Sequence, residues 1–468
     1  MRLLRAVVVV LIALSFSGEA AAFWGSRTPK HGEAWWRTDG TGRYPKATPP
    51  LTWSTGQNVL WKRPLKNWSN ATPVLHKDRI FTLEEPSTVV CLDQKTGEEL
   101  WRADANFDAV QGEDAARDRQ RREELAVRQR DLQKKLNDLS TAARERPGDT
   151  AVQRETAAAR AELQTLLAEI QQIDQRQRAT GLPPTHGANG YSSPTPVAAG
   201  ERVWMFFGTG VAAAFDLQGK RLWARVAGRP TNGWGHSASP VLVDGKLVLH
   251  IDRTVHALDP ESGKELWNAP SASWWGTPFP VEVGGEWAVV TTGGALIRCR
   301  DGKVVSTQIG EIPWTSPYAE AGVVYVVDAN GASAWKLPAK LDDSVQLQRL
   351  WQTPVPSDRY YASPLLHEGL LYAMTQASLM TVLDAATGAV VYQRGLDLGA
   401  TAYPSFCLAG GKIFASSESG KTIVFEPGRE YRQVAANAIE SFRSTPVFSG
   451  SRIYIRGLQH LWCLGAGE

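Results

Sequence analysis

The hydrophobic pattern between residues 238 and 267 is that of short strands joined by tight turns. Apolar runs alternate with polar turn residues, first at Asp244-Gly245 and again between Asp259 and Gly263. Asp-Gly pairs favour hairpin turns, and glycine supplies the positive φ that such turns need. The pattern therefore predicts four consecutive antiparallel strands, at 240–243, 247–251, 255–258 and 265–267.

The same unit recurs along most of the chain. Its Ser/Thr-Pro start lies at Thr72-Pro73, Ser193-Pro194, Ser239-Pro240, Thr277-Pro278, Ser316-Pro317, Ser363-Pro364 and Thr445-Pro446, with a degenerate copy at Tyr403-Pro404-Ser405. Most starts are about 40 residues apart, a period typical of propellers and other repeat arrays. Eight starts predict an all-β fold: an eight-bladed β-propeller of four-stranded antiparallel blades.

The ends of the repeat predict how the propeller closes. Residues 57–62 read as a fourth strand without the three that should precede it, whereas the last copy ends at 464 without a fourth strand. We expect 57–62 to pair with 460–464, because closure removes exposed sheet edges. We expect the tryptophans near the ends of the repeats to dock between neighbouring blades; these are Trp61, Trp101, Trp223, Trp267 and Trp351.

One long gap separates the first two repeats. Residues 108–181 are rich in Glu, Arg, Gln, Ala and Leu, and apolar residues there follow alternating steps of three and four. Pro147-Gly148 interrupts this pattern. The pattern predicts an inserted antiparallel coiled-coil hairpin with helices at 110–146 and 150–179, each roughly 45–55 Å long. Its place after a fourth strand predicts that it leaves from the face that carries the blade-to-blade connections.

The remaining segments complete the domain organisation. Residues 1–22 combine basic residues, a short apolar run and small residues near Ala22, which is typical of a signal peptide. Residues 23–56 form an N-terminal arm, expected to lie as a strap on the propeller with Trp35 or Trp36 as its anchor. The closing strand and blade 1 occupy 57–107, and blades 2–8 occupy 182–468. A polar loop is expected at 337–345.

Composition narrows the classes of function. The formal net charge of +3 is small for 468 residues and does not favour a nucleic-acid surface. Export permits disulfides, but three of the four cysteines occupy the same slot of the repeat, and equivalent slots of different blades are usually too far apart to bond. Buried free thiols are therefore expected. No spacing indicates a metal site. Phosphate-binding glycine loops and nucleophile motifs are also missing, so no catalytic residue is assigned.

One position in each repeat is expected to lie beside the central channel of the propeller. Residues three before each Pro should enter the innermost strand near the axis, and many are aromatic. An aromatic mouth with a few polar groups has the make-up of a small-molecule pocket; alternatively, these side chains pack against adjacent blades and cap the core. The candidate ligand-binding residues are Tyr191, His236, Trp275, Trp314, Tyr361, Tyr403 and Arg443.

The repeat, Ser-Pro-Val…Asp-Gly…Val-x-Ala-Leu-Asp-x-x-Ser/Thr-Gly-x-x-Leu-Trp, resembles the pyrroloquinoline-quinone-type β-propeller repeat of secreted bacterial proteins. The resemblance covers 57–107 and 182–464. One branch of this family holds quinoprotein dehydrogenases, which use the quinone, Ca²⁺, an adjacent-Cys disulfide and an Asp base. Here no two Cys are adjacent, and the Ca²⁺ ligands have no match. The other branch resembles BamB, a lipoprotein of the outer-membrane assembly machinery; this chain lacks the lipidation Cys.

These observations favour an exported, non-catalytic propeller scaffold, BamB-like, that binds an envelope or secreted protein through the hairpin and its face. The alternative is a protein that binds pyrroloquinoline quinone or a sugar, or a quinoprotein oxidoreductase, at the aromatic mouth. No cofactor is predicted under the first hypothesis, whereas the quinone and calcium belong to the second. No transmembrane segment is expected after signal cleavage, so the protein should be periplasmic or extracellular.

Overall fold

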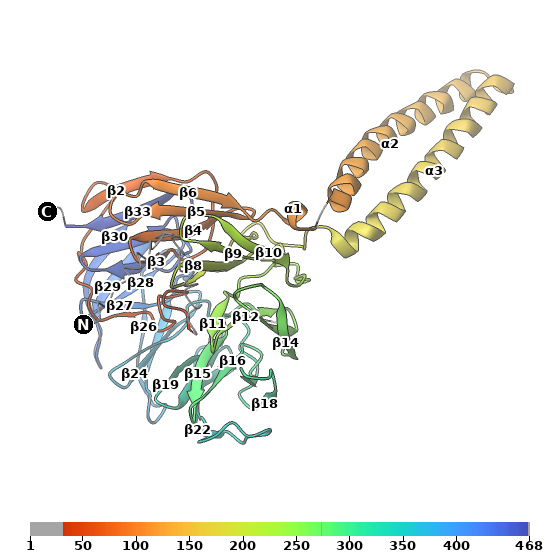
Figure 1. Cartoon of the computed structure of the whole chain (residues 1–468). Helices are drawn as coiled ribbons and strands as arrows, with labels where there is room; N and C mark the ends of the chain where they lie inside the picture. The colour runs from red at the N-terminus through yellow and green to blue at the C-terminus, as the bar shows by residue number, and fades with distance from the viewer. Residues whose placement is uncertain (1–30, 112, 273, 467–468) are drawn as a thin grey trace, which may run out of the picture.

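A computed structural model describes residues 31–466 except 112 and 273, and in these ranges the chain forms an eight-bladed β-propeller from which a helical hairpin projects (Figure 1). The predicted signal peptide, 1–22, lies outside the described residues. No helix within the described part is long and apolar enough to cross a bilayer. The all-β, eight-bladed prediction is confirmed.

Each blade is an antiparallel meander whose strands are hydrogen-bonded in sequence order. Blade 1 consists of β3 (Val74–His76), β4 (Arg79–Glu84), β5 (Thr88–Asp93) and β6 (Glu99–Asp104), and blade 2 of β7 (Val197–Ala199), β8 (Arg202–Phe206), β9 (Val211–Asp216) and β10 (Arg221–Val226). Blade 3 consists of β11 (Val241–Val243), β12 (Lys246–Ile251), β13 (Thr254–Leu258) and β14 (Glu265–Pro270), and blade 4 of β15 (Phe279–Val283), β16 (Glu286–Val290), β17 (Leu296–Arg298) and β18 (Val304–Ser306).

Blades 5 to 8 repeat the arrangement. Blade 5 consists of β19 (Tyr318–Glu320), β20 (Val323–Asp328), β21 (Gly331–Lys336) and β22 (Gln348–Thr353), and blade 6 of β23 (Leu365–His367), β24 (Leu370–Met374), β25 (Leu379–Asp384) and β26 (Val390–Gly395). Blade 7 consists of β27 (Cys407–Ala409), β28 (Lys412–Ser416), β29 (Lys421–Glu426) and β30 (Arg432–Ala438), and the chain ends in blade 8 with β31 (Val447–Ser449), β32 (Arg452–Arg456) and β33 (His460–Gly465). First strands of neighbouring blades contact one another, so they line the axis.

The last blade is completed by the N-terminal part of the chain, as predicted. Strand β2 (Val59–Pro64) pairs antiparallel with β33, with Trp61 opposite Cys463. This pairing hydrogen-bonds the outer edge of β33, and because β2 continues into β3, it ties blade 8 to blade 1. The four cysteines are buried and free, and burial raises the pKa of each thiol to about 12.

A ring of hydrogen bonds joins the blades around the axis. In each blade the backbone N–H of one Ser or Thr donates to the side-chain hydroxyl of its equivalent in the next blade, at 2.9 to 3.2 Å. We call these eight residues the hydroxyl belt. They are Thr72, Thr195, Ser239, Thr277, Ser316, Ser363, Ser405 and Thr445. The belt closes on itself, because Thr445 N donates to Thr72 Oγ1.

A second repeated contact joins the blades near their outer edges. The indole N–H of each fourth-strand tryptophan donates to a backbone carbonyl in the turn of the next blade, at 2.8 to 3.0 Å. The same rings lie against a glycine of that turn, which has positive φ and no space for a Cβ. The pairs are Trp61 with Gly97, Trp101 with Gly219, Trp223 with Gly263, Trp267 with Gly302, and Trp351 with Gly388.

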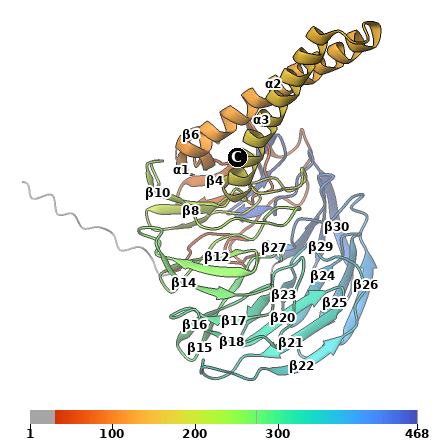
Figure 2. The same ribbon diagram turned by 90° about the vertical axis from the view of Figure 1, so that its right-hand side faces the viewer.

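The insertion forms an antiparallel helical hairpin (Figures 1 and 2). It comprises α1 (Phe107–Gln111), α2 (Glu113–Glu145) and α3 (Thr150–Thr180). Leu125, Leu132 and Leu166 are buried between α2 and α3, and Arg121 pairs with Glu169 across the seam. Phe107 in α1 is buried in the core of blades 1 and 2, so this leg of the hairpin is anchored in the propeller.

Two segments differ from the sequence-based expectations. The arm does not lie flat on the surface: β1 (Arg43–Tyr44) adds in parallel to the innermost strand β27, and Ala34 bridges Ala198 in the innermost strand of blade 2. The 337–345 loop is not simply polar, because Leu341 and Val345 are buried against blade 4. In both cases the segment packs against blades that are distant from it in the local sequence pattern.

Candidate functional site

The predicted mouth residues surround the start of the first strands, two residues before the hydroxyl belt. Each blade has one mouth position, and in seven of the eight blades it is the position predicted from the Ser/Thr-Pro start, with Tyr403 aligned through Ser405 in the degenerate copy. Blade 2 differs. The belt residue there is Thr195, so the mouth position is Ser193 and not Tyr191. The mouth set is therefore Asn70, Ser193, Ser237, Trp275, Trp314, Tyr361, Tyr403 and Arg443.

On one side of the mouth, rings and guanidinium groups stack in series. Arg359 lies over the Trp314 ring, 5.6 Å from its centroid, and donates to Tyr361 Oη at 3.2 Å. Tyr361 stacks on Tyr403 with centroids 4.8 Å apart, and Arg443 lies over Tyr403 at 5.8 Å. The three rings and Arg443 are half-buried, Arg359 is exposed, and neighbouring groups of the row cover one another's faces. The arrangement is a packed row that spans blades 5 to 8.

The other side of the mouth is covered by the chain that returns from the hairpin. We call residues 181–190 the return segment. Its Ala188 carbonyl accepts hydrogen bonds from Asn70 at 2.9 Å and from Arg443 at 3.0 Å, which lie in blades 1 and 8. Asn189 donates to the Trp234 carbonyl at 2.9 Å, before blade 3. The mouth and the base of the hairpin are therefore one connected structure. The sequence predicts that both lie on one face, but it does not predict that the return segment bonds them together.

Three other predicted ligand residues make hydrogen bonds within the protein. His236 is 5% exposed, its Nε2 lies 2.9 Å from the Ala238 carbonyl, and its ring packs edge-on against Phe206. Burial lowers the pKa of His236 to about 4, so the imidazole is neutral at physiological pH. Trp275 donates its indole N–H to the Gly235 carbonyl at 3.2 Å. Tyr191, off the ring, donates to the Pro183 carbonyl of the return segment at 2.8 Å.

Carboxylates near the mouth are each engaged by neighbours. Glu418 pairs with Arg443 at 3.0 Å, and Glu311 accepts from the Trp274 indole at 2.7 Å. Glu85 accepts from the backbone N–H groups of Tyr191 and Ser192, and burial raises the pKa of its carboxyl. Among the residues that the structure describes, no group of three or more His, Cys, Asp or Glu is placed to hold a metal.

These observations test the fit of a quinone with Ca²⁺. Such a group needs a free aromatic face at the mouth and several converging oxygen ligands. Here the Tyr361 and Tyr403 faces cover each other, Arg359 lies over Trp314, and Glu418 is held by Arg443. The residues present do not fit this pair of groups.

The opposite end of the channel is filled by the arm. Arg37 is 1% exposed and donates to the Pro364 and Phe406 carbonyls at 3.0 and 3.1 Å. Trp35 packs against Phe279 of the innermost strand β15. Arg37 has only backbone carbonyls and no carboxylate as hydrogen-bond acceptors, and burial lowers its pKa. Arg37 therefore clasps the arm to blades 6 and 7.

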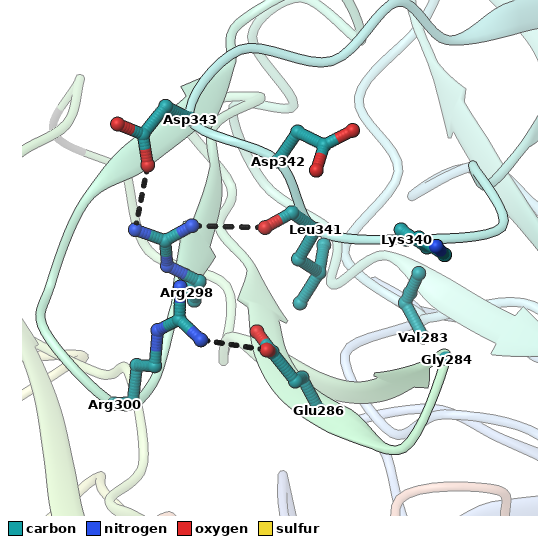
Figure 3. A pocket seen from close by; sticks show the side chains of 9 residues that line it. All are labelled: Val283, Gly284, Glu286, Arg298, Arg300, Lys340, Leu341, Asp342 and Asp343. Atoms are coloured by element: carbon teal, nitrogen blue, oxygen red, sulfur yellow. Dashed lines mark hydrogen bonds and ion pairs between the residues drawn. The ribbon is translucent and has the colours of Figure 1, made fainter.

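Two pockets of about 350 and 310 Å³ lie away from the mouth, at turns between strands. The larger one separates the extended first hairpin of blade 4 from the 337–347 loop (Figure 3). Its Arg298 binds Asp301, Asp343 and the Leu341 carbonyl, and its Arg300 binds Glu286. The guanidinium groups that line this pocket are thus satisfied within the protein.

Comparisons with known proteins agree with the fold. A sequence model of the family described as "Outer membrane protein assembly factor BamB" matches residues 29–252 and 251–466. No protein with a curated description matches the sequence. The crystal structure of BamB from Moraxella catarrhalis superposes with a TM-score of 0.50 at 9% identity, covering 86% of this chain and 98% of that chain.

Two further solved structures share the architecture. Quinohemoprotein alcohol dehydrogenase from Comamonas testosteroni has a TM-score of 0.52 at 9% identity, covering 95% of this chain and 82% of that one. The computationally designed protein Ika8 has a TM-score of 0.52 at 9% identity, covering 86% and 100%. Identities this low show the fold alone.

Proposed function

We propose that this chain, which belongs to the family of outer membrane protein assembly factor BamB, is a non-catalytic scaffold of the cell envelope that binds a protein partner through its helical hairpin and the propeller face beneath it. The observation that carries this proposal is the mounting of the hairpin. One leg is fixed by Phe107 in the core of blades 1 and 2, and the other is bonded across the mouth by the return segment.

Rigid mounting suits a binding element. A partner that docks on a fixed arm loses its own freedom but does not have to order the arm, which lowers the cost of association. The hairpin also has a polar, charged exterior whose ion pairs, such as Arg121 with Glu169, are exposed. Such pairs stabilise little by themselves and leave the surface available for specific contacts.

The experiment that tests this proposal compares two forms of the mature protein isolated from envelopes of the source cell. The first is the intact chain, and the second has residues 108–180 replaced by a short Gly-Ser linker. We expect partners that co-purify with the intact chain to be lost with the shortened one. Partners that stay bound to the shortened chain, with the propeller still folded by circular dichroism, would refute the hairpin as the contact.

A second candidate function is the binding of a small planar ligand at the mouth, which would first have to open. The specific observation is the row of Trp314, Tyr361 and Tyr403 with two guanidinium groups. A ligand would have to displace stacking contacts already made. Titration with pyrroloquinoline quinone and Ca²⁺, followed by absorbance and by dye-linked alcohol oxidation, separates the candidates, because binding would require this row to open.

A further inference from the structure

Most strongly exposed large hydrophobic side chains of the described residues have a structural explanation. Six lie near the start of the outer strands, at or beside the β-bulge that recurs there: Leu100, Leu222, Leu266, Leu350, Val390 and Val434. Val127 and Leu167 lie on the hairpin helices. The two that remain, Trp234 at 55% and Leu182 at 45% exposure, belong to neither group.

These two residues lie in segments that are bonded to each other at the base of the hairpin. Leu182 follows the last residue of α3 by two positions, and its carbonyl accepts from Arg229 at 3.3 Å. The Trp234 carbonyl accepts from Asn189 of the return segment at 2.9 Å. We call the surface formed by Leu182, His186 and Trp234 the corner, because it lies where the hairpin leaves the propeller.

The backbone of the corner is constrained by hydrogen bonds and close packing, although its side chains face solvent. Trp234 occupies a turn closed by Asn232 and Gly235, and its N–H donates to Asn232 Oδ1 at 2.9 Å. Gly235 has φ of 83°, and a Cβ there would lie 2.2 Å from Thr185 Oγ1, so the turn is packed tightly on the return segment. His186 lies against the indole with centroids 4.1 Å apart. The Trp234 side chain nevertheless remains 55% exposed.

Tryptophan is among the residue types that most often dominate protein interfaces, because one ring buries a large area while few side-chain torsions have to be fixed. The charge of the corner indicates the kind of partner. Residues 181–190 and 230–238 contain no Asp, Glu, Lys or Arg, and the nearby Arg229 donates to the Gly181 and Leu182 carbonyls. The carboxylate of Asp252, which accepts from Thr231 at 2.7 Å, balances the charge of Arg229 at the edge of this surface. A surface without net positive charge does not suit phosphates or anionic lipid headgroups, which need basic side chains.

We propose that the corner is a docking site for an uncharged segment of a protein partner, which inserts an aromatic or leucine side chain against Trp234 while it runs beside α3. This inference rests on the proposed function, since a partner that contacts the hairpin passes this surface. It adds to that function a defined anchor and the chemistry of the segment that it accepts.

The test is selection of a random peptide library displayed on phage against the intact mature chain, with counter-selection against the Trp234→Ala variant. Trp234→Phe, which keeps an aromatic ring, and Leu266→Ala, which removes an equally exposed apolar side chain from a distant strand, serve as controls. Thermal unfolding of every variant reports whether the fold is retained.

We expect enriched peptides to carry an aromatic or leucine anchor and to lose at least about tenfold in affinity with Trp234→Ala, a loss typical of an interface hot spot. Trp234→Phe should retain part of the binding, and Leu266→Ala all of it. Peptides that bind Trp234→Ala equally well, or no enrichment at all, would overturn the proposal. A change of intrinsic fluorescence with maltohexaose that is absent in Trp234→Ala, without peptide binding, would assign the corner to glycans instead.

The outcomes separate this inference from the proposed function. If Trp234→Ala removes peptide binding while the chain without its hairpin keeps its envelope partners, the docking site at the corner is supported and the proposed contact through the hairpin is refuted. If loss of the hairpin removes the partners while Trp234→Ala changes neither them nor peptide binding, only the corner is refuted.

Discussion

The contribution of the hydroxyl belt to the free energy of unfolding can be measured directly, because one hydroxyl oxygen can be removed from it with little change in the shape of the side chain. Thr277 Oγ1 accepts the Ser239 N–H at 3.0 Å, and both residues are buried, at 4% and 2% exposure. Thr277→Val replaces this hydroxyl with a methyl group. Its own N–H, which donates to Ser316 at 2.9 Å, is unaffected. The substitution therefore leaves one buried N–H without its acceptor.

The expected cost follows from the desolvation of that N–H. A buried donor that loses its partner costs about 1–3 kcal/mol, more than the net value of the bond itself, because water cannot replace the lost acceptor. We expect Thr277→Val to lower the free energy of unfolding in urea by about this amount. Thr277→Ser retains the oxygen and should recover most of the loss. Thr307→Val, at an exposed position, should change stability by less than about 0.5 kcal/mol.

A loss no larger than that of Thr307→Val would show that the belt bond contributes nothing and would refute the reasoning. The closed geometry allows a further measurement. Thr72, in blade 1, accepts the N–H of Thr445 and lies three blades from Thr277. If the belt bonds act independently, Thr72→Val and Thr277→Val should add within about 0.5 kcal/mol. A larger combined loss would show that the belt acts as one cooperative ring.

Three further predictions follow from single contacts. Burial lowers the pKa of His236 from 6.5 to about 4. Because the pKa in the folded state is the lower one, the neutral imidazole contributes about 3 kcal/mol of stability that is complete above pH 6.5 and is lost as the pH falls towards 4. The substitution His236→Gln should therefore flatten this part of the Tm–pH curve. Leu166→Ala in the hairpin seam should cost about 2–5 kcal/mol and make the hairpin sensitive to protease, whereas Leu167→Ala, next to it but 42% exposed, should not. Gly388→Ala places a Cβ 2.5 Å from the Trp351 ring at φ of 75° and should lower Tm measurably; an unchanged Tm would contradict the tight blade contact.

Turn chemistry and apolar periodicity predicted the blades because both act within a few residues. Asp-Gly and Asp…Gly turns allow only short antiparallel connections, so a repeat of about 40 residues with four apolar runs leads to a propeller. The hairpin was predicted for the same reason: the three-and-four spacing around Leu132 and Leu166 and the break at Pro147-Gly148 specify two helices and a turn. The pairing of β2 with β33 was predicted because the first repeat is preceded by one unpaired strand and the last repeat lacks its fourth strand.

The tertiary structure decided the site. Ser193-Pro194 and Thr195-Pro196 carry the same local signal, and only hydrogen bonds from blades 1 and 3 select Thr195 for the belt, which moves Tyr191 off the mouth. The return segment has no periodicity, so its position across the mouth depends on contacts with distant residues such as Arg443. The arm likewise has no pattern that places Arg37 in the channel. The sequence by itself determined the local elements and their number, whereas long-range hydrogen bonds and packing, which no local pattern encodes, decided which residues meet.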